Sequence, residues 1–313
     1  MLKKIGTQVK KALYSPACPE ALFDIYFKQK TRKDRKRLKQ ILSNGHPLMD
    51  QLKPGQKEHW EERIAEVIRC EDNRDIPRVN NAGKIIDQQL IMHNGIAVDP
   101  LSYYHFPMLE MLRQNKGVHE PQEEKIFQEV LQSMDSNKEL VMLELGAYWS
   151  FYSLWCKTMH PKTNCYMVEP DRKNLHYGKA NFKLNQMQGQ FLHGKIGKAV
   201  DRSANILSVD HICQKYQLSF VDLLHTDIQG YEVDMLAGAQ NLLSNQKVGY
   251  WFVSTHSNEL HYECQKVLEE HGYQIIANID LDASYSWDGV LVAKLPGYFG
   301  IDRVTYSKKM QQR

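Results

Sequence analysis

Residues 140–171 read LVMLELGAYWSFYSLWCKTMHPKTNCYMVEPD and decide the fold. The stretch begins with an apolar strand that ends near Leu145 and turns at Gly146. A helix over about 150–159 follows, and then a second apolar strand that ends at Glu169. Two strands joined by a helix run parallel, and the carboxyl ends of parallel strands open onto a ligand crevice. The stretch therefore predicts a ligand-binding α/β sheet.

Each of these strands carries a carboxylate where it ends. The two carboxylates belong to Glu144 and Glu169, 25 positions apart. An acidic residue about 20 positions past the first turn chelates the ribose hydroxyls of a bound nucleotide in such sheets. We therefore expect a cofactor that contains a nucleoside.

The turn between strand and helix discriminates among such cofactors. A dinucleotide needs a glycine-rich loop, because its pyrophosphate approaches bare backbone. Here Gly146 and Ala147 are followed by Tyr148 and Trp149, two bulky side chains that would crowd a pyrophosphate. S-adenosylmethionine carries no phosphate, and Glu144 suits its methionine ammonium group. The loop favours S-adenosylmethionine over NAD, and an NAD-dependent oxidoreductase is the less favoured alternative.

Composition is that of a soluble globular protein, with 313 residues, 42% hydrophobic and 25% charged. This length predicts one large domain and an accessory region. No apolar run approaches the roughly 20 residues that span a membrane, and the N-terminus lacks the apolar core of a secretory signal. The six cysteines form no CxxC pair. We therefore expect a reducing, cytoplasmic setting, with neither a disulfide framework nor a zinc site.

Charge is unevenly distributed along the chain. Residues 1–40 hold twelve Lys or Arg and three acidic residues, whereas 41–313 hold 28 basic and 34 acidic residues. The basic run 28–39 could contact an acidic membrane surface or a polyanion. A solvated helical face is the favoured interpretation. Aromatic residues are not interleaved with the run, so no nucleic-acid partner is expected.

The first 120 residues form a mostly helical N-terminal region in this interpretation. A β-hairpin is expected within 84–100, KIIDQQLIMHNGIAVDP, because its HNG turn separates two apolar runs. The region has no catalytic motif, so we expect a lid, a substrate module or a dimerisation module. Residues 121–313 would form the cofactor-binding domain.

Strands alternate with helices after Glu169, which predicts a doubly wound, mostly parallel, seven-stranded sheet. The end of the chain breaks this rhythm. YQIIANIDL (273–281) and GVLVAKL (289–295) are separated by too few residues for a parallel crossover. They must pair antiparallel, which predicts an antiparallel C-terminal edge strand. The whole arrangement is Rossmann-like and is typical of class I methyltransferases.

Several short blocks place polar residues at strand ends and glycines in turns. They are GVHEP (117–121), ELGAYWS (144–150), VEPD (168–171), LSVDHI (207–212), LLHTDIQGYEVDMLAGA (223–239) and STH (254–256). Over about 117–295 the chain resembles the FkbM family of S-adenosylmethionine-dependent methyltransferases. Four positions depart from the family pattern. Tyr148 stands where asparagine is usual, Ser150 where glycine is usual, Gln229 for glutamate and His225 for lysine.

The resemblance implies a role for seven residues. It implies that Gly146 and Ala147 line the cofactor turn, that Glu144 lies near the methionine amine and that Glu169 binds the ribose. Lys195 and Ile196 would lie by the adenine. Asp227 would face the cofactor or the acceptor. Methyl transfer to a hydroxyl also needs a general base. The candidates are His256 first, then His225 and Asp227, because histidine titrates near neutrality. His225 is equally interpreted as a packed side chain.

Mg²⁺ prefers oxygen ligands, and Asp227, Glu232 and His256 could supply some. Three scattered residues are weak support, so no metal site is assigned and Mg²⁺ is an unsupported option.

The resemblance implies O-methylation, and a sugar hydroxyl in a glycan or glycosylated natural product is the expected acceptor. Five aromatic residues could stack on a sugar: Tyr103, Tyr104, Trp149, Trp155 and Trp287. The alternatives are N-methylation of a peptide or side-chain amide, and a non-catalytic adaptor that keeps the fold.

Overall fold

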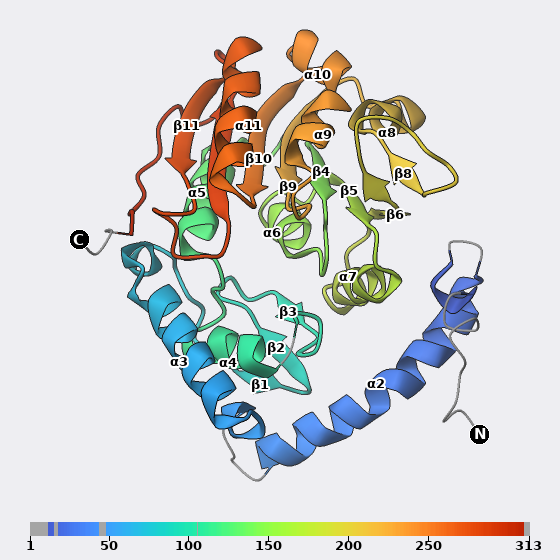
Figure 1. The fold of residues 1–313 in the computed structure, drawn as a ribbon, viewed down its shortest axis with the longest axis vertical. Helices are drawn as coiled ribbons and strands as arrows, with labels where there is room; N and C mark the ends of the chain where they lie inside the picture. Colours follow the sequence, from blue (N-terminus) through green and yellow to red (C-terminus); the bar gives the residue numbers. More distant parts are fainter. Residues whose placement is uncertain (1–11, 16–17, 44–47, 105, 310–313) are drawn as a thin grey trace.

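A seven-stranded sheet forms the centre of the molecule in the computed structural model, which describes residues 12–15, 18–43, 48–104 and 106–309 (Figure 1). The strand order is β11-β12-β10-β9-β4-β5-β6. The strands are β4 (Val141–Leu145), β5 (Asn164–Glu169), β6 (Gln190–His193), β9 (Val221–Thr226), β10 (Val248–Thr255), β11 (Gln274–Ile279) and β12 (Gly289–Lys294). This confirms the predicted fold class, a doubly wound and mostly parallel sheet.

One detail differs from the sequence prediction. β12 is the reversed strand and pairs antiparallel with both β10 and β11, so it lies inside the sheet and β11 forms the edge. The expected antiparallel edge strand is therefore corrected to an antiparallel strand beside the edge. The difference in burial between the two strands explains this order. Every residue of β12 is buried, as its run of apolar residues favours, whereas β11 carries the exposed Gln274 and the half-buried Asn278.

Helices cover both faces of the sheet, because alternate residues of each strand point to opposite sides. One core contains Met142 of β4 and Phe252 of β10, packed against three helices of the cofactor-binding part and against the N-terminal region. The opposite core contains Leu143 and Trp251, packed under four. The three helices on the face with Met142 and Phe252 are α5 (Pro121–Ser133), α6 (Phe151–Met159) and α7 (Arg172–Leu184). The other four are α8 (Val209–Tyr216), α9 (Glu232–Ala237), α10 (Gln240–Ser244) and α11 (Asn258–Glu270).

The N-terminal region packs below the carboxyl ends of the strands in Figure 1. Its elements are α2 (Glu20–Ser43), η1 (Leu48–Gln51), α3 (Pro54–Arg69), η2 (Glu71–Arg74), β1 (Ile85–Ile86), β2 (Gln89–Ile91), β3 (Ala97–Val98) and α4 (Phe106–Gln114). The predicted hairpin is present as β2 and β3, and β1 adds a third antiparallel strand. A separate parallel pair, β7 (Lys195–Ile196) and β8 (Ile206–Leu207), follows β6.

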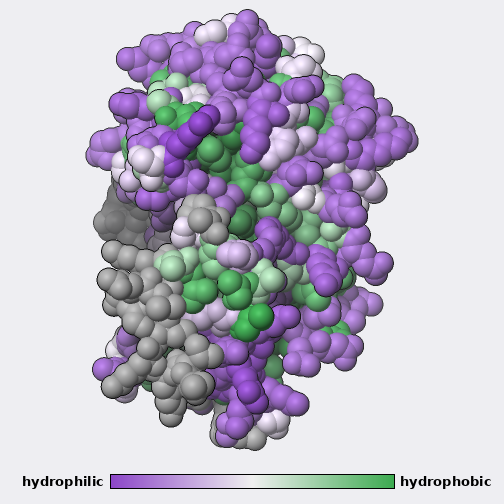
Figure 2. Space-filling model, turned by 90° about the vertical axis from the view of Figure 1, so that its right-hand side faces the viewer, coloured by the Kyte–Doolittle hydropathy of each residue, from purple (hydrophilic) through white to green (hydrophobic). Residues whose placement is uncertain are grey.

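Helix α2 presents the basic run to solvent. All eight Lys and Arg side chains within 28–39 are exposed, while Phe23 and Phe27 pack against Tyr177 of α7. This is the solvated helical face favoured by the sequence, and contact with a membrane stays a prediction. Figure 2 shows hydrophilic residues over most of one face, with apolar residues gathered near its middle. None of the described helices is long and apolar enough to cross a bilayer, and all six cysteines are free thiols.

Candidate active site

Two adjoining pockets open at the carboxyl ends of the strands. The outer pocket has a volume of about 380 Å³ and is lined by Glu169, Lys195, Ile196 and Ile228, among others. The inner pocket holds about 50 Å³. Four residues line both pockets, and they are Tyr104, Gly146, Tyr148 and Asp227. The pockets therefore meet at the predicted cofactor turn.

Glu169 ends β5 as a fixed carboxylate in the wall of the outer pocket. Its Oε2 accepts a hydrogen bond from the backbone N–H of Tyr148 at 2.9 Å, and its Oε1 accepts one from Asp171 at 2.8 Å. Burial raises the pKa of Glu169 to about 7, although these hydrogen bonds act in the opposite direction. A carboxylate held in this way by the backbone is pre-oriented to accept further hydrogen bonds from a ribose diol.

Gly146 allows two backbone segments to touch. Its φ is +73°, and a Cβ atom at this position would lie 1.8 Å from the carbonyl oxygen of Asp227. The backbone N–H groups of Gly146 and Ala147 both donate to the carbonyl of Val168, so the turn is fastened to β5. A side chain at position 146 would push the two pocket walls apart, and this single glycine is therefore structurally required.

The two aromatic residues after the turn behave differently. Tyr148 lines both pockets, and its hydroxyl accepts a hydrogen bond from the backbone N–H of Tyr104 at 2.6 Å. Trp149 is buried and stacks on Tyr103 and Phe151, with ring centroids 4.7 and 5.2 Å away. Of the two rings expected to crowd a pyrophosphate, Tyr148 therefore borders the outer pocket, whereas Trp149 lines the inner pocket alone.

Glu144 lies in the wall of the inner pocket, beside Gly146. It is buried, and its Oε2 accepts a hydrogen bond from the backbone N–H of Ser153 at 3.2 Å. Burial raises the pKa of this carboxyl to about 7, and the nearby His225 acts against the rise. A buried carboxylate in this place suits the cationic methionine end of the cofactor, and that role stays a prediction.

His225 is a packed side chain here. Its Nε2 lies 2.7 Å from Oε1 of Glu123 on α5, and its ring stacks on Tyr152 with centroids 4.1 Å apart. Burial lowers the pKa of His225, but the Glu123 carboxylate outweighs burial and raises it. The geometry favours the second interpretation in the sequence analysis, a packed histidine, over the general base.

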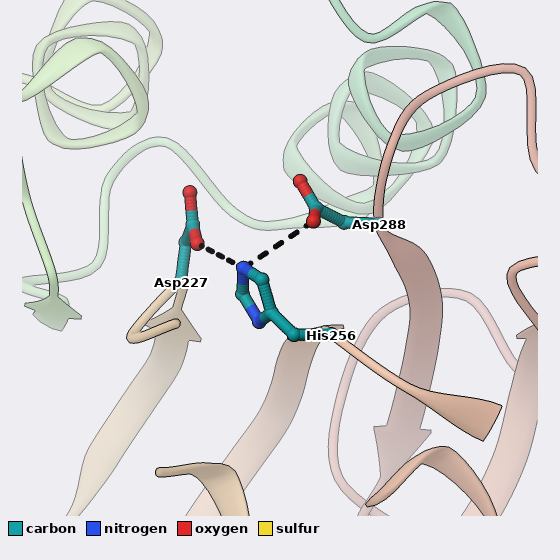
Figure 3. Close-up of side chains that lie close together, drawn as sticks. All are labelled: Asp227, His256 and Asp288. Atoms are coloured by element: carbon teal, nitrogen blue, oxygen red, sulfur yellow. Dashed lines mark ion pairs between the residues drawn. The ribbon is translucent and has the colours of Figure 1, made fainter. Parts of the chain in front are cut away.

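His256 lies among the carboxylates of Asp227, Glu232 and Asp288, and Figure 3 shows the first and the last of these. Its Nε2 is 3.2 Å from Oδ1 of Asp227 and 3.3 Å from Oδ1 of Asp288. Its Nδ1 is 2.7 Å from Oε1 of Glu232. Burial lowers the pKa of His256, but the Asp227 and Glu232 contacts outweigh burial and raise it to about 10. This pKa lies above the near-neutral value expected of the general base, and the role of His256 as the base stays a prediction.

Sequence reasoning missed several residues of the inner pocket. Asp288, Arg63, His119 and Glu120 all line it. Burial raises the pKa of the Glu120 carboxyl to about 8. The GVHEP block at 117–121, which resembles a family segment, is the sequence signal that contains His119 and Glu120. Asp288 and Arg63 lie outside the sequence motifs, so no sequence pattern indicated that they line the pocket.

The outer pocket fits S-adenosylmethionine. Its volume falls within the roughly 300–1,000 Å³ of small-molecule sites. The oriented Glu169 carboxylate forms a polar end that suits the ribose. The side chains of Ile196, Ile206 and Ile228 form an apolar surface that suits the adenine. Ile196 is buried and Lys195 is exposed. The strand order and this pocket define a class I methyltransferase that depends on S-adenosylmethionine.

Comparison with models of protein families identifies the family within this class of methyltransferases. The model of the Methyltransferase FkbM domain matches residues 92–275, more than half of the chain. The chain belongs to this family. The match begins 25 residues before the stretch that resembled the family in sequence, so it includes β3 and α4 of the N-terminal region.

Solved methyltransferases are similar to parts of the chain at low identity. The METTL16 methyltransferase domain is 12% identical, with 66% of this chain and 87% of that chain covered and a TM-score of 0.44. Precorrin-6y C5,15-methyltransferase from Geobacter metallireducens is 12% identical, covering 55% and 88%, with a TM-score of 0.39. TrmK from M. capricolum, bound to S-adenosyl-homocysteine, is 12% identical, covering 55% and 69%, with a TM-score of 0.39. Comparison with curated proteins gives no match.

Proposed function

We propose that this methyltransferase modifies a hydroxyl group of a sugar, within a glycan or a glycosylated natural product. The supporting observation is the composition of the inner pocket, where aromatic rings and carboxylates meet beside the cofactor turn. Sugar hydroxyls donate hydrogen bonds to carboxylates, and the C–H faces of a sugar pack on aromatic rings. The carboxylates of Glu120, Asp227 and Asp288 supply the acceptors.

Two of the five candidate aromatic residues are accessible to an acceptor. Tyr104 is 45% exposed and Trp287 is 50% exposed, and both line the inner pocket. The other three, Tyr103, Trp149 and Trp155, are buried in the core. The inner pocket has room for only the reacting end of an acceptor, since one water molecule already needs about 10–15 Å³. The rest of the sugar would lie over the two exposed rings.

Asp227 is the base that the geometry supports. Its Oδ1 accepts a hydrogen bond from Gln229 and faces His256. Its other carboxylate oxygen points away from His256 in Figure 3, so a hydroxyl can approach it. When bound, S-adenosylmethionine supplies the electrophilic methyl group. Asp227 borders both pockets, which supports a base that acts between a donor in one pocket and an acceptor in the other.

The test uses the purified protein and a donor with a ¹³C-labelled methyl group. Sugars, glycans and peptides are offered as acceptors, and NMR of the product distinguishes a methyl group on oxygen from one on nitrogen. We expect an O-methylated sugar. Asp227→Asn should lower kcat by about 10²- to 10⁴-fold, the usual contribution of a general base. The exposed Asp234→Asn serves as the matched control.

N-methylation is the second candidate, because carboxylates accept hydrogen bonds from amides and amines as readily as from hydroxyls. Methylation of peptides alone would replace the sugar proposal with this one. The adaptor alternative requires a different pattern. In that case S-adenosylhomocysteine would bind, Glu169→Ala would weaken it by about 1–3 kcal/mol, and no acceptor would be methylated.

A further inference from the structure

Three side chains from three separate elements converge beside the inner pocket, and two of them, Asp227 and Asp288, line it. Asp227 follows β9, His256 follows β10 and Asp288 precedes β12 (Figure 3). Each offers one ligand atom, and these atoms lie within 4.8 Å of one another. We propose that Asp227, His256 and Asp288 form a binding site for a divalent cation.

Glu232 orients the histidine for this purpose. Its Oε1 lies 2.7 Å from Nδ1 of His256 and also accepts the backbone N–H of Gly230 at 2.9 Å. Glu232 is fully buried, so turning the ring away would leave this buried carboxylate with the Gly230 N–H as its one hydrogen-bond donor in the described structure. Metal-binding histidines are commonly held through their second nitrogen by a carboxylate. The other nitrogen, Nε2, is buried, faces both aspartates and makes no well-aligned hydrogen bond.

Charge around the three side chains also favours a cation. Asp227, Asp288 and Glu232 surround one imidazole, and Glu120 lines the same pocket. Arg63 brings positive charge to this pocket, but its guanidinium is bound to Glu66 at 2.8 Å and to the carbonyl of Tyr285 at 2.6 Å. Grouped carboxylates repel one another, and a bound cation would relieve that repulsion.

The donor atoms indicate which cation fits. Two carboxylate oxygens and one imidazole nitrogen suit Mg²⁺ or Mn²⁺, which prefer six ligands in octahedral geometry. Three protein ligands leave three positions open, and Asp227 and Asp288 both border the inner pocket. Two neighbouring hydroxyls of the acceptor could fill two of these positions. The acceptor is then a sugar with a vicinal diol, and this part of the inference rests on the proposed function.

Direct binding of Mn²⁺ tests the site without any assay of activity. The purified 313-residue protein is freed of metals with a chelator, the chelator is removed, and Mn²⁺ is titrated while EPR follows the free ion. We expect one ion per chain and at least tenfold weaker binding by Asp288→Asn. Glu232→Gln should weaken binding about 10- to 100-fold, as loss of an orienting partner does. Asp234→Asn, an exposed carboxylate on the same helix as Glu232, should bind as the wild type does.

Two results would overturn the site: no binding of Mn²⁺ by the wild type at millimolar concentration, or equal binding by Asp288→Asn. Thermal melting of each variant identifies a fold defect, and Asp288→Asn preserves shape. Titration with S-adenosylhomocysteine in the presence of chelator tests the proposed function separately, because the outer pocket does not include His256 or Asp288. Undiminished sugar methylation in chelator, or equal turnover of a sugar and its deoxy analogue without the neighbouring hydroxyl, would refute the diol.

Discussion

Tyr148 and Ser150 both adopt left-handed backbone conformations, with φ of 44° and 62°. These are the two positions of the cofactor turn where the family usually has asparagine and glycine. Glycine enters this region without strain and asparagine tolerates it well, whereas other residues pay roughly 1–2 kcal/mol. The departures from the family pattern are therefore strained positions, and the turn keeps its shape because hydrogen bonds hold it to β5 and to Glu169.

This strain gives a first prediction. Ser150→Gly should be more stable than Ser150→Ala by about 0.5–1 kcal/mol, because glycine relieves the left-handed strain but has more entropy to lose on folding. Alanine keeps the strain and serves as the control for loss of the hydroxyl. Urea unfolding of the two variants measures the difference. An alanine variant as stable as the glycine variant would show that the turn carries no strain at this position.

Individual site residues were predictable where they directly follow an apolar strand. Glu144, Glu169, Asp227 and His256 all lie at or near the carboxyl end of a run that is recognisable in the sequence. Their partners were not predictable in the same way. The pairing of His225 with Glu123 joins residues 102 positions apart, and no periodic pattern reports which side chains meet over such a distance.

Strand direction explains why Asp288 joins the site. The functional edge of the sheet lies at the carboxyl ends of its parallel strands. Because β12 runs the other way, its amino end lies at that edge, and Asp288 is the residue just before it. The sequence predicted the reversal of this strand from the short connection after β11. The position of Asp288 follows from that reversal, whereas the predicted site residues lie at or after the carboxyl ends of parallel strands.

The connection between β11 and β12, residues 280–288, is held in place by α5. Gln122 of α5 donates hydrogen bonds to the carbonyls of Ala283 at 3.2 Å and Ser307 at 2.8 Å. Its Oε1 accepts the backbone N–H of Tyr285 at 2.7 Å. One buried amide therefore fixes both this connection and the C-terminal segment.

Gln122→Ala should release that connection. We expect a loss of about 1–3 kcal/mol in unfolding free energy, because buried partners are left unsatisfied. Hydrogen exchange should rise across 280–288, while the affinity for S-adenosylhomocysteine stays within about twofold, since Gln122 does not line the outer pocket. Gln128→Ala, on the same helix but outside this network, is the control. Unchanged exchange across 280–288 would contradict the role given to Gln122.

At the scale of the whole molecule, the N-terminal region and the sheet share one core. Buried side chains from both sides of residue 120 belong to it, including Val67 of α3 and Phe127 of α5. The predicted boundary at 120 was placed just before the helix that begins at Pro121, and it stays a prediction. Alternating strands and helices made the sheet predictable. The position of the N-terminal region relative to the sheet depends on contacts between distant, irregular segments. Such contacts leave no periodic signal in the sequence.

A buried ionic group joins these two parts of the chain. Glu124 of α5 is fully buried, with Oε2 3.0 Å from Nε2 of His93 and Oε1 2.6 Å from Nδ1 of His119. His93 follows β2, so the group links the three-stranded sheet to α5. Oε1 of Glu124 also accepts the backbone N–H groups of His119 and Glu120, which lead into the helix. Breaking a buried pair of this kind typically costs about 3–5 kcal/mol.

The stability from this group should depend on pH. Burial lowers the pKa of His119, but Glu124 and Glu120 outweigh burial and raise it to about 9. Its contribution is fully present below the unfolded pKa of roughly 6.5 and is lost as pH rises through 9. Burial also raises the pKa of Glu124, but the two histidines hold it below its usual value. Its contribution is present above about pH 4.5 and is lost as pH falls toward the folded pKa.

Both contributions are therefore complete only between about pH 4.5 and 6.5. The wild type should melt several degrees above His119→Gln in this window, since each kcal/mol shifts Tm by roughly 2–4 °C in domains of about 200 residues. The difference should shrink between pH 6.5 and 9, as calorimetric melting at a series of pH values would record. His59→Gln, an exposed histidine, should track the wild type throughout. A difference that stays constant to pH 9 would mean that His119 stabilises the fold by packing alone, with no share from its charge.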